Sequence, residues 1–344
     1  MQVRVGILTA PHIDFIQHEK TFVLKNVRIG IGFHWDRLED QEFAGTLEIL
    51  HNPDGTETAV NIIDMEEYLC SVISSEMSAD SPLELLKAHA VISRSWLIRA
   101  IDHTDHVGYD VCADDHCQRY EGLRRMKDRA VQAVLETKGQ VLTYADEVCD
   151  CRYHKCCGGR TELFSTCWED IDFPYLQSVE CPYCKEADNR QTLNDYDQET
   201  TDYHDWQVTY TQQELHDILL EKTGIDFGDL IEIIPLRRGA SGRIYELKIV
   251  GTRATHILSK ELTIRRALSR TCLYSSWFDI HKKQEAAPHS SLTNLHTYKF
   301  DLTGHGWGHG VGLCQIGAAE MAKRGCTYQH ILSFYYPNTL LKQL

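Results

Sequence analysis

The chain has 344 residues, of which 42% are hydrophobic, so it is long enough to bury a large core and to form two domains. Its formal net charge of -15 argues against sequence-independent binding of nucleic acid, because such proteins neutralise phosphates with a surplus of lysine and arginine. No apolar run approaches the roughly 18 to 20 residues that span a bilayer, so the sequence predicts no transmembrane helix.

The first sixty residues predict a region of strands. Hydrophobic and polar residues alternate in residues 3–8, 24–32 and 45–50, as in strands that bury one face. The sequence Asn52-Pro53-Asp54-Gly55 predicts a turn after the last of these strands. Residues 1–8 lack the apolar block of a secretory signal, so we expect either a cytoplasmic protein or one whose leader is absent from this sequence.

A long and largely buried helix is predicted over residues 81–100, where apolar residues recur at helical spacing. Ser81 is expected to cap this helix and Pro82 to occupy its first turn. A second helix is predicted over residues 128–138, ended by Gly139 and followed by a strand over residues 140–144.

Between residues 190 and 300 the composition changes, and this segment predicts an inserted lobe. A polar stretch comes first, and another polar stretch leads out of the segment toward a closing helix at residues 315–324. The elements expected inside it are helices at residues 211–223 and 259–268 and strands at residues 231–237, 243–251 and 255–259.

Together these elements predict an α+β fold. It would consist of a mixed core domain with a long buried helix and β-strands, plus an inserted smaller α/β lobe. We expect residues 1–60 to form an N-terminal strand region that packs on the core, residues 61–190 and 300–344 to form the core, and residues 191–299 to form the lobe.

Thirteen cysteines are unusual in a chain of this length, and ten of them fall between Cys70 and Cys184. Clustering favours disulfide bridges or metal ligands over scattered buried thiols. Because the count is odd, disulfides alone cannot pair all of them.

Glu76 is the candidate general acid. We expect it in a short apolar loop ahead of the long helix, where a carboxylic acid tends to keep its proton. A solvated or capping glutamate is the alternative. Lys87 and Arg94 are seven residues apart and share a face of the helix, so they need a polar partner, either a substrate group or a carboxylate such as Glu66 or Glu67.

His106, Cys112, His116 and Cys117 lie within twelve residues and offer the ligands that tetrahedral zinc prefers. A Cys112–Cys117 disulfide or idle thiols are the alternatives. A second cysteine cluster follows, in which the pair Cys181 and Cys184 forms a half-site for metal or a redox dithiol. Its partners are sought among three earlier cysteines, namely Cys156, Cys157 and Cys167.

Two further segments have the features of a site. His154 is followed by Cys156, Cys157 and two glycines, so the imidazole could project into a cleft, although a tight turn with an incidental histidine is the simpler explanation. Residues 304–318 alternate six glycines with two histidines and a tryptophan, which allows backbone to approach backbone or ligand closely. This segment is interpreted as the wall of a site, or as a glycine-rich turn before the closing helix.

Five ordered blocks of the sequence resemble the SpoIID/LytB family, which comprises stage II sporulation protein D and the LytB amidase enhancers. The blocks are residues 65–77, 85–95, 116–122, 153–162 and 306–312. The resemblance covers roughly half of the chain, about residues 60–180 and 300–344.

The resemblance implies a peptidoglycan lytic transglycosylase, acting on glycan strands stripped of stem peptides and leaving 1,6-anhydro-MurNAc ends. It implies that Glu76 is catalytic and that a structural zinc lies on His106, Cys112, His116 and Cys117, here with one residue fewer than expected between Cys112 and His116. The substrate-binding positions that it implies are Lys87, Arg94, Tyr120, His154, Trp307 and His309. Cys156, Cys157, Cys181 and Cys184 lie outside the family pattern as a possible second cluster.

Two other functions remain open. The chain could be a non-catalytic glycan-binding module that enhances an N-acetylmuramoyl-L-alanine amidase, or a zinc hydrolase built on the His106 cluster. The sequence has no His-Glu-x-x-His pattern, which argues against the hydrolase. Peptidoglycan strands and an amidase are the expected partners, and a location outside the cytoplasm is expected.

Overall fold

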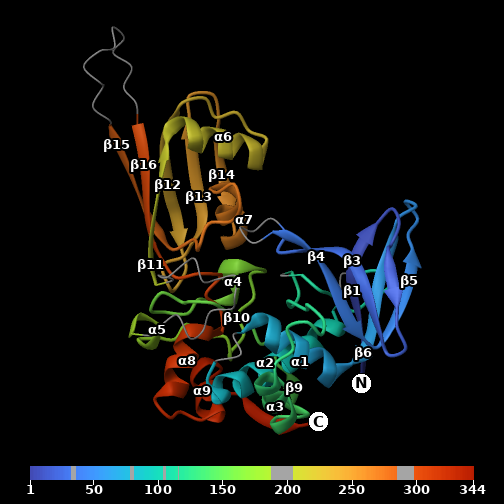
Figure 1. Cartoon of the computed structure of the whole chain (residues 1–344). Coiled ribbons are helices and arrows are strands. Elements are labelled where there is room, and N and C mark those ends of the chain that lie inside the picture. The colour runs from blue at the N-terminus through green and yellow to red at the C-terminus, as the bar shows by residue number, and fades with distance from the viewer. Residues whose placement is uncertain (32–35, 78–80, 104–105, 115, 187–203, 285–297) are drawn as a thin grey trace. The chain divides into compact units, whose positions relative to one another are not determined.

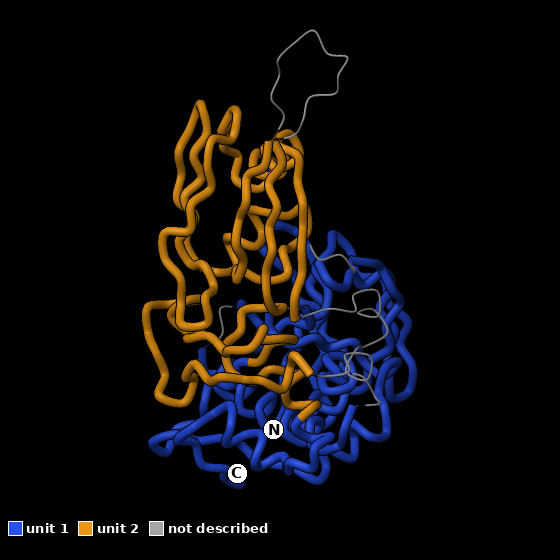
Figure 2. The backbone as a smooth tube through the Cα atoms, turned by 90° about the vertical axis from the view of Figure 1, so that its left-hand side faces the viewer, with its two compact units in different colours: residues 1–152, 188–200, 321–344 blue, residues 153–187, 201–320 orange. Residues whose placement is uncertain are grey.

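The computed structural model describes residues 1–31, 36–77, 81–103, 106–114, 116–186, 204–284 and 298–344 (Figure 1). It confirms the mixed α+β class, with helices and several small sheets. The chain forms two compact units (Figure 2). Among the described residues, unit 1 takes those within 1–152 and 321–344, and unit 2 takes those within 153–186 and 204–320. Among the described residues, no helix is long and apolar enough to cross a membrane.

Unit 1 contains the expected N-terminal strands, and three more that the sequence did not predict, namely β2, β4 and β6. The predicted turn is confirmed, since the backbone N–H of Gly55 donates to the carbonyl of Asn52. The strands of unit 1 are β1 (Gln2–Ala10), β2 (Phe15–Gln17), β3 (Thr21–Ile29), β4 (Arg37–Ala44), β5 (Thr46–His51), β6 (Glu57–Asp64), β7 (Val111–Cys112), β8 (Gln140–Tyr144), β9 (Glu147–Val148) and β18 (Leu340–Gln343). They form sheets of order β5-β6-β1-β7, β2-β3-β4 and β18-β8-β9.

The helices of unit 1 are α1 (Met65–Glu76), α2 (Leu83–Ile101), α3 (Asp128–Glu136) and α9 (Tyr328–Tyr335). Helix α2 is the predicted long helix, and it packs against α1, α3, α9 and β8. Because neighbours surround it, twelve of its nineteen residues are buried. The expected serine cap is wrong: Pro82 occupies the N-cap position and no side chain caps the helix.

Unit 2 contains the lobe. Its elements are β10 (Tyr153–His154), α4 (Phe164–Cys167), α5 (Tyr183–Glu186), β11 (Asp205–Thr211), α6 (Gln212–Thr223), β12 (Leu230–Arg238), β13 (Ile244–Gly251), β14 (Thr255–Ser259), α7 (Glu261–Ala267), β15 (Phe278–Gln284), β16 (Tyr298–His305) and β17 (Leu313–Cys314). Its sheets have the orders β11-β16-β15, β12-β13-β14 and β10-β17. Helix α8 (Gln315–Lys323) begins in unit 2 and ends in unit 1.

The unit boundaries differ from the expected domains at 190 and 300. Strand β16 pairs with both β11 and β15, which draws residues 298–305 into the sheet of the lobe. Strand β10 pairs in parallel with β17, so His154 lies opposite Cys314. Long-range strand pairing therefore assigns residues 153–187 and 300–320 to the same unit as the lobe.

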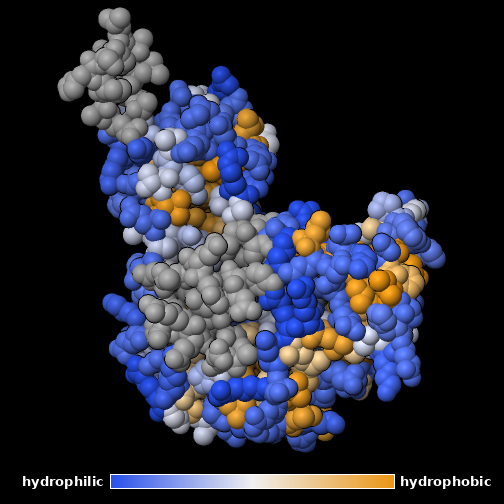
Figure 3. Space-filling model, viewed as in Figure 1, coloured by the Kyte–Doolittle hydropathy of each residue, from blue (hydrophilic) through white to orange (hydrophobic). Residues whose placement is uncertain are grey.

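The surface shown in Figure 3 is mostly hydrophilic, as the composition predicts. Hydrophobic side chains gather over the N-terminal strands of unit 1, where Phe15, Ile16 and Leu38 are exposed. Single exposed hydrophobic residues are common on soluble proteins and need no further explanation.

Candidate functional site

Glu76 lies at the C-terminal end of α1, not in the loop that the sequence predicted. Its side chain is half-buried, and one carboxyl oxygen accepts a hydrogen bond of 3.0 Å from the backbone N–H of Arg119. The helix end leaves carbonyl groups unpaired and carries a partial negative charge, which opposes a carboxylate there. The backbone hydrogen bond orients the carboxyl group.

The segment of residues 119–122 runs along the last turns of α1. Ser71 donates its hydroxyl to the carbonyl of Gly122 at 2.7 Å, and the backbone N–H of Glu121 donates to the hydroxyl of Ser75 at 3.3 Å. With the Arg119 bond, three contacts hold residues 119–122 against the helix end. The placement of Glu76 therefore depends on this segment.

His106, Cys112, His116 and Cys117, named here the His–Cys cluster, come together in unit 1. Their ligand atoms all lie within 4.8 Å of one another. Nε2 of His106 is 3.3 Å from Sγ of Cys117, and Nδ1 of His116 is 3.5 Å from the same sulfur. A hydrogen bond from the Cys117 thiol lowers the pKa of Cys112, and the same contact raises the pKa of Cys117. Two imidazoles and two sulfurs at these separations fit a tetrahedral zinc ion with all four positions filled by protein.

A cavity of about 610 Å³ adjoins the His–Cys cluster in unit 1. His106, Cys112 and His116 line it together with residues of β1 and β3. Of the two carboxyl groups, Glu121 is among the described residues that line this cavity and Glu76 is not. Burial raises the pKa of Glu121, which is 2% exposed and paired with arginines on the loop and on β4. The sequence did not single out this carboxyl group, although it lies in one of the family blocks.

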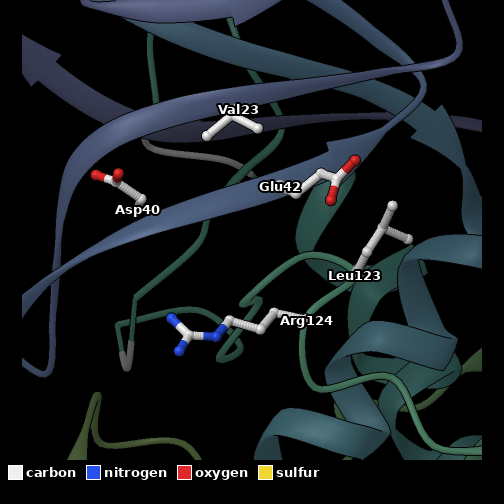
Figure 4. A pocket seen from close by; sticks show the side chains of 5 residues that line it. All are labelled: Val23, Asp40, Glu42, Leu123 and Arg124. Carbon is white, nitrogen blue, oxygen red and sulfur yellow. The ribbon is translucent and has the colours of Figure 1, made fainter. Parts of the chain in front are cut away.

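A smaller cavity of about 390 Å³ is lined by residues of β3, of β4 and of the loop that precedes α3 (Figure 4). It is lined by Val23, Asp40, Glu42, Leu123 and Arg124. Asp40 is bonded to Lys25 at 2.7 Å, and Glu42 accepts a bond of the same length from Thr21. Because both carboxylates already have protein partners, this cavity is a weaker candidate for a site.

The two cations of α2 have protein partners. Arg94 is fully buried and makes two hydrogen bonds to Glu66, of 3.0 and 2.7 Å, plus one to the carbonyl of Gln140. Lys87 pairs with Glu84 and Glu136. The sequence left open a substrate group or a carboxylate as the partner, and in the structure Arg94 has the carboxylate of Glu66. These ion pairs give both cations a structural role, and substrate binding by Arg94 and Lys87 stays a prediction.

Tyr120 is also buried. Its hydroxyl donates to Asn61 at 2.6 Å, and its ring packs against Phe43 and Tyr68. Burial raises the pKa of Tyr120 above its ordinary value. Because Tyr120 lines the larger cavity with its hydroxyl already bonded, it contributes mainly apolar surface there.

In unit 2, His154 and His309 lie together, with ring centroids 5.7 Å apart. Burial lowers the pKa of His154 to about 3, so the ring is neutral, and its Nδ1 donates to the carbonyl of Val311 at 3.1 Å. The ring of His309 packs edge-on against Trp168, and that of Trp307 against Tyr274. The structure thus brings the predicted residues of unit 2 together around the glycine-rich segment.

The glycines of residues 304–312 surround a buried arginine that the sequence did not suggest. Arg243 is fully buried and donates to the carbonyls of Gly308 and Cys157, each at 3.2 Å. A Cβ at Gly310, where φ is +84°, would lie 2.4 Å from Cζ of Arg243. Some of these glycines are therefore needed for internal packing around Arg243. The only sequence feature that could have indicated this is that Arg243 is a basic residue in the turn before β13.

Glu162, the last residue of the fourth family block, is fully buried beside this turn. It accepts hydrogen bonds from the backbone N–H of Ala240 and Ser241 and from the Ser241 hydroxyl, at 2.9, 3.1 and 2.6 Å. A carboxylate with this many donors is held in place and stabilises the turn.

Four buried cysteines form another group in unit 2, which we name the four-cysteine cluster. Its members are Cys157, Cys181, Cys184 and Cys314. The sequence predicted three of them and did not predict Cys314. The thiol of Cys156, the fourth cysteine that the sequence proposed, lies next to the cluster and hydrogen-bonds with Cys184 and Cys314. Hydrogen bonds from the neighbouring thiols, with that of Cys156 first, lower the pKa of Cys184, and burial raises the pKa of Cys314. This cluster could bind a metal ion.

A third group unites two histidines with a carboxylate in unit 2. Asp205 accepts from His305 at 2.6 Å and from His204 at 2.8 Å. Hydrogen bonding between the ring nitrogens and the carboxylate accounts for this arrangement, so it needs no metal ion.

Comparison with known proteins matches a family model to the region of the first three sequence blocks, residues 65–77, 85–95 and 116–122. A family model described as Stage II sporulation protein matches residues 53–144, and one described as a domain of unknown function matches residues 162–312. Stage II sporulation protein D of Bacillus subtilis is 24% identical over 300 residues, covering 83% of this chain and 76% of its own length.

These matches support a relationship to the SpoIID/LytB family.

Two other relatives show how the family varies. An uncharacterised protein of Brachyspira hyodysenteriae is 29% identical to this chain over 298 residues, covering 86% of this chain and 71% of that protein. An amidase enhancer of Bacillus subtilis is 27% identical over 302 residues, covering 79% of this chain and 40% of the enhancer. The similar proteins therefore include one named for a stage of sporulation and one named for enhancing an amidase.

Proposed function

We propose that this protein is a peptidoglycan lytic transglycosylase that cleaves the bond between N-acetylmuramic acid and N-acetylglucosamine in peptide-stripped glycan. The observation that carries the proposal is the carboxyl group of Glu76, half-buried at the end of α1 and oriented by the backbone N–H of Arg119. It lies within the segment that the Stage II sporulation protein model matches.

In the proposed reaction, Glu76 first donates its proton to the glycosidic oxygen as the bond to the anomeric carbon breaks. The resulting carboxylate then accepts the proton of the muramoyl 6-hydroxyl, whose oxygen attacks that carbon. A 1,6-anhydro ring forms, Glu76 recovers its proton, and no water is consumed. One carboxyl group suffices because the nucleophile belongs to the substrate, in contrast to glycosidases with two carboxylates.

The donor set of the His–Cys cluster fits zinc, which would be held by His106, Cys112, His116 and Cys117. Such an ion would crosslink the loop and supply no reactive water, because four protein ligands leave no open position. Arg119 follows Cys117 by two residues, so fixing the loop fixes the backbone N–H that orients Glu76. The ion thus has a structural role.

We extend the proposal to the surroundings of the enzyme. A peptidoglycan substrate requires a location outside the cytoplasm, and we propose that an amidase supplies the peptide-free strands. Trp307 offers an aromatic ring suited to packing on a sugar in unit 2. The relative named amidase enhancer favours a second candidate, a glycan-binding protein that acts through an amidase without cleaving glycan itself.

The test is product analysis by mass spectrometry on glycan strands freed of stem peptides. We expect anhydromuramoyl ends from the native protein and none from Glu76→Gln, while the exposed Glu147→Gln variant keeps full activity. Binding of glycan without new ends would support the enhancer. A Glu121→Gln variant tests the rival carboxyl group: if it loses cleavage while Glu76→Gln retains it, the assignment of the acid is wrong.

A further inference from the structure

The four-cysteine cluster joins three segments that are far apart in sequence. Cys157 follows β10, Cys181 and Cys184 lie at the start of α5, and Cys314 ends β17. We propose that these four cysteines bind a structural Zn²⁺ ion that clasps the base of the lobe in unit 2. This site is independent of the proposed glycan cleavage and of the His–Cys cluster.

The sulfur positions suit a single ion. With Zn–S bonds of about 2.3 Å, a tetrahedral site separates its sulfurs by roughly 3.8 Å. The four sulfurs lie within 4.8 Å of one another, and those of Cys157 and Cys184 are 3.4 Å apart. Small movements would therefore bring all four to the required separation. A group this tight leaves no room for a multinuclear iron–sulfur cluster.

The sulfur of Cys314 already accepts hydrogen bonds of the kind that a metal-bound thiolate receives. Backbone N–H groups of Cys157 and Gly317 donate to its sulfur at 3.3 and 3.4 Å. Gly317 lies in the first turn of α8, whose unpaired N–H groups stabilise negative charge. Such bonds to sulfur are the outer contacts expected of a metal-bound thiolate.

The charge of the environment agrees with this assignment. A zinc ion with four thiolates carries a net charge of -2, and the site is dry, since its four side chains are at most 2% exposed. Arg243 is a fully buried cation that donates to the carbonyl of Cys157 at 3.2 Å. Its Nη2 has no hydrogen-bond partner among the described residues. The positive charge of this guanidinium would offset part of the negative charge of the zinc–thiolate site.

The alternatives explain less. Isolated buried cysteines act as small apolar residues, but that role does not require four sulfurs from three segments to converge. The described cysteines are all free thiols in the structure, and the even count within the cluster also permits two disulfides in an oxidising compartment. The experiment below separates zinc from disulfides.

A zinc ion bound by the four-cysteine cluster would join two distant points of the chain. Cys157 and Cys314 are opposite ends of a segment that encloses residues 162–312, the range of the second family model. Joining them with the Cys181–Cys184 turn would pin both ends of the lobe to one point. Metal removal should therefore loosen the lobe while leaving unit 1 folded.

The test measures zinc in the full-length protein in a background that lacks the other cluster. A Cys112→Ser/Cys117→Ser variant should retain one zinc per chain, with four sulfur neighbours at about 2.3 Å by X-ray absorption. Adding Cys184→Ser should reduce the zinc content from one to none, whereas adding Cys167→Ser, a buried cysteine outside the cluster, should leave it at one.

Chelation of the background variant keeps the proposal falsifiable if Cys184→Ser does not fold. We expect chelation to expose protease sites within residues 158–313 and to make the four thiols reactive toward alkylation. The proposal is overturned if the background variant holds no zinc, if it binds iron instead, or if its denatured mass shows that the cluster cysteines are paired as disulfides. Failure of glycan cleavage would leave these readouts unchanged.

Discussion

The ion pair between Arg94 and Glu66 gives the sharpest test of how unit 1 is held together. Arg94 is fully buried in α2, and removal of its guanidinium would delete two bonds to the Glu66 carboxylate and one to the carbonyl of Gln140. The side chain of Glu66 is only 14% exposed. In the variant its carboxylate would retain one hydrogen bond, the 3.2 Å bond from the backbone N–H of Gly139. Breaking a buried pair from one side costs about 3–5 kcal/mol, because the remaining charge is left without compensation.

We therefore expect Arg94→Leu to lower the free energy of unfolding by about 3–5 kcal/mol. The matched control is Arg99→Leu on the same helix, since Arg99 is 34% exposed and its pair with Glu147 is loose, at 3.9 Å. An exposed pair of this kind contributes at most about 1 kcal/mol. Replacing both partners, as Glu66→Met/Arg94→Leu, should recover most of the lost stability because no buried charge remains.

The assay is urea unfolding, with hydrogen exchange of α2 peptides reporting on unit 1. Glycan binding by Arg94→Leu, measured under conditions where it remains folded, should be unchanged because the guanidinium has no exposed surface. The reasoning is refuted if Arg94→Leu is as stable as the native protein, or if it loses glycan binding while retaining full stability. The second result would support the substrate-binding role that the sequence suggested for Arg94.

Two further predictions concern unit 2. Gly310→Ala places a Cβ 2.4 Å from Cζ of buried Arg243 at a φ of +84°, so we expect a loss of about 2–5 kcal/mol in thermal or urea unfolding. Gly224→Ala, with a φ of +70° and open space, should cost only about 1–2 kcal/mol, and equal losses would contradict the clash. His154 has its pKa lowered to about 3 by burial, so acid protonates the unfolded state first. Neutral His154 therefore leaves the free energy of unfolding unaffected by pH above about pH 6.5. Below that pH the free energy of unfolding falls by about 1.4 kcal/mol per pH unit, down to about pH 3. His154→Asn should flatten this slope, and an unchanged slope in unfolding measured from pH 7 to 5 would disprove the assignment.

Much of the fold could be predicted from local pattern. The helical spacing over residues 81–100, the strands at residues 231–259 and the turn at Gly55 are all present, since each depends on residues close in sequence. The His–Cys cluster was predictable for the same reason, because its four ligands fall within twelve residues. The family blocks identified Glu76, although α1 extends to include it.

Long-range pairing decided the rest. The local sequence pattern does not show whether Arg94 pairs with Glu66, 28 residues away, or with a substrate. The ion pair with Glu66 forms because α1 packs against α2. Cys314 enters the four-cysteine cluster because β10 and β17 pair in parallel, with paired residues 160 positions apart in sequence. Residue types and their spacing determined which chemical groups this protein carries. The tertiary structure decided which of them meet and which are consumed by internal contacts, because strand register and helix packing act between segments that are distant in sequence.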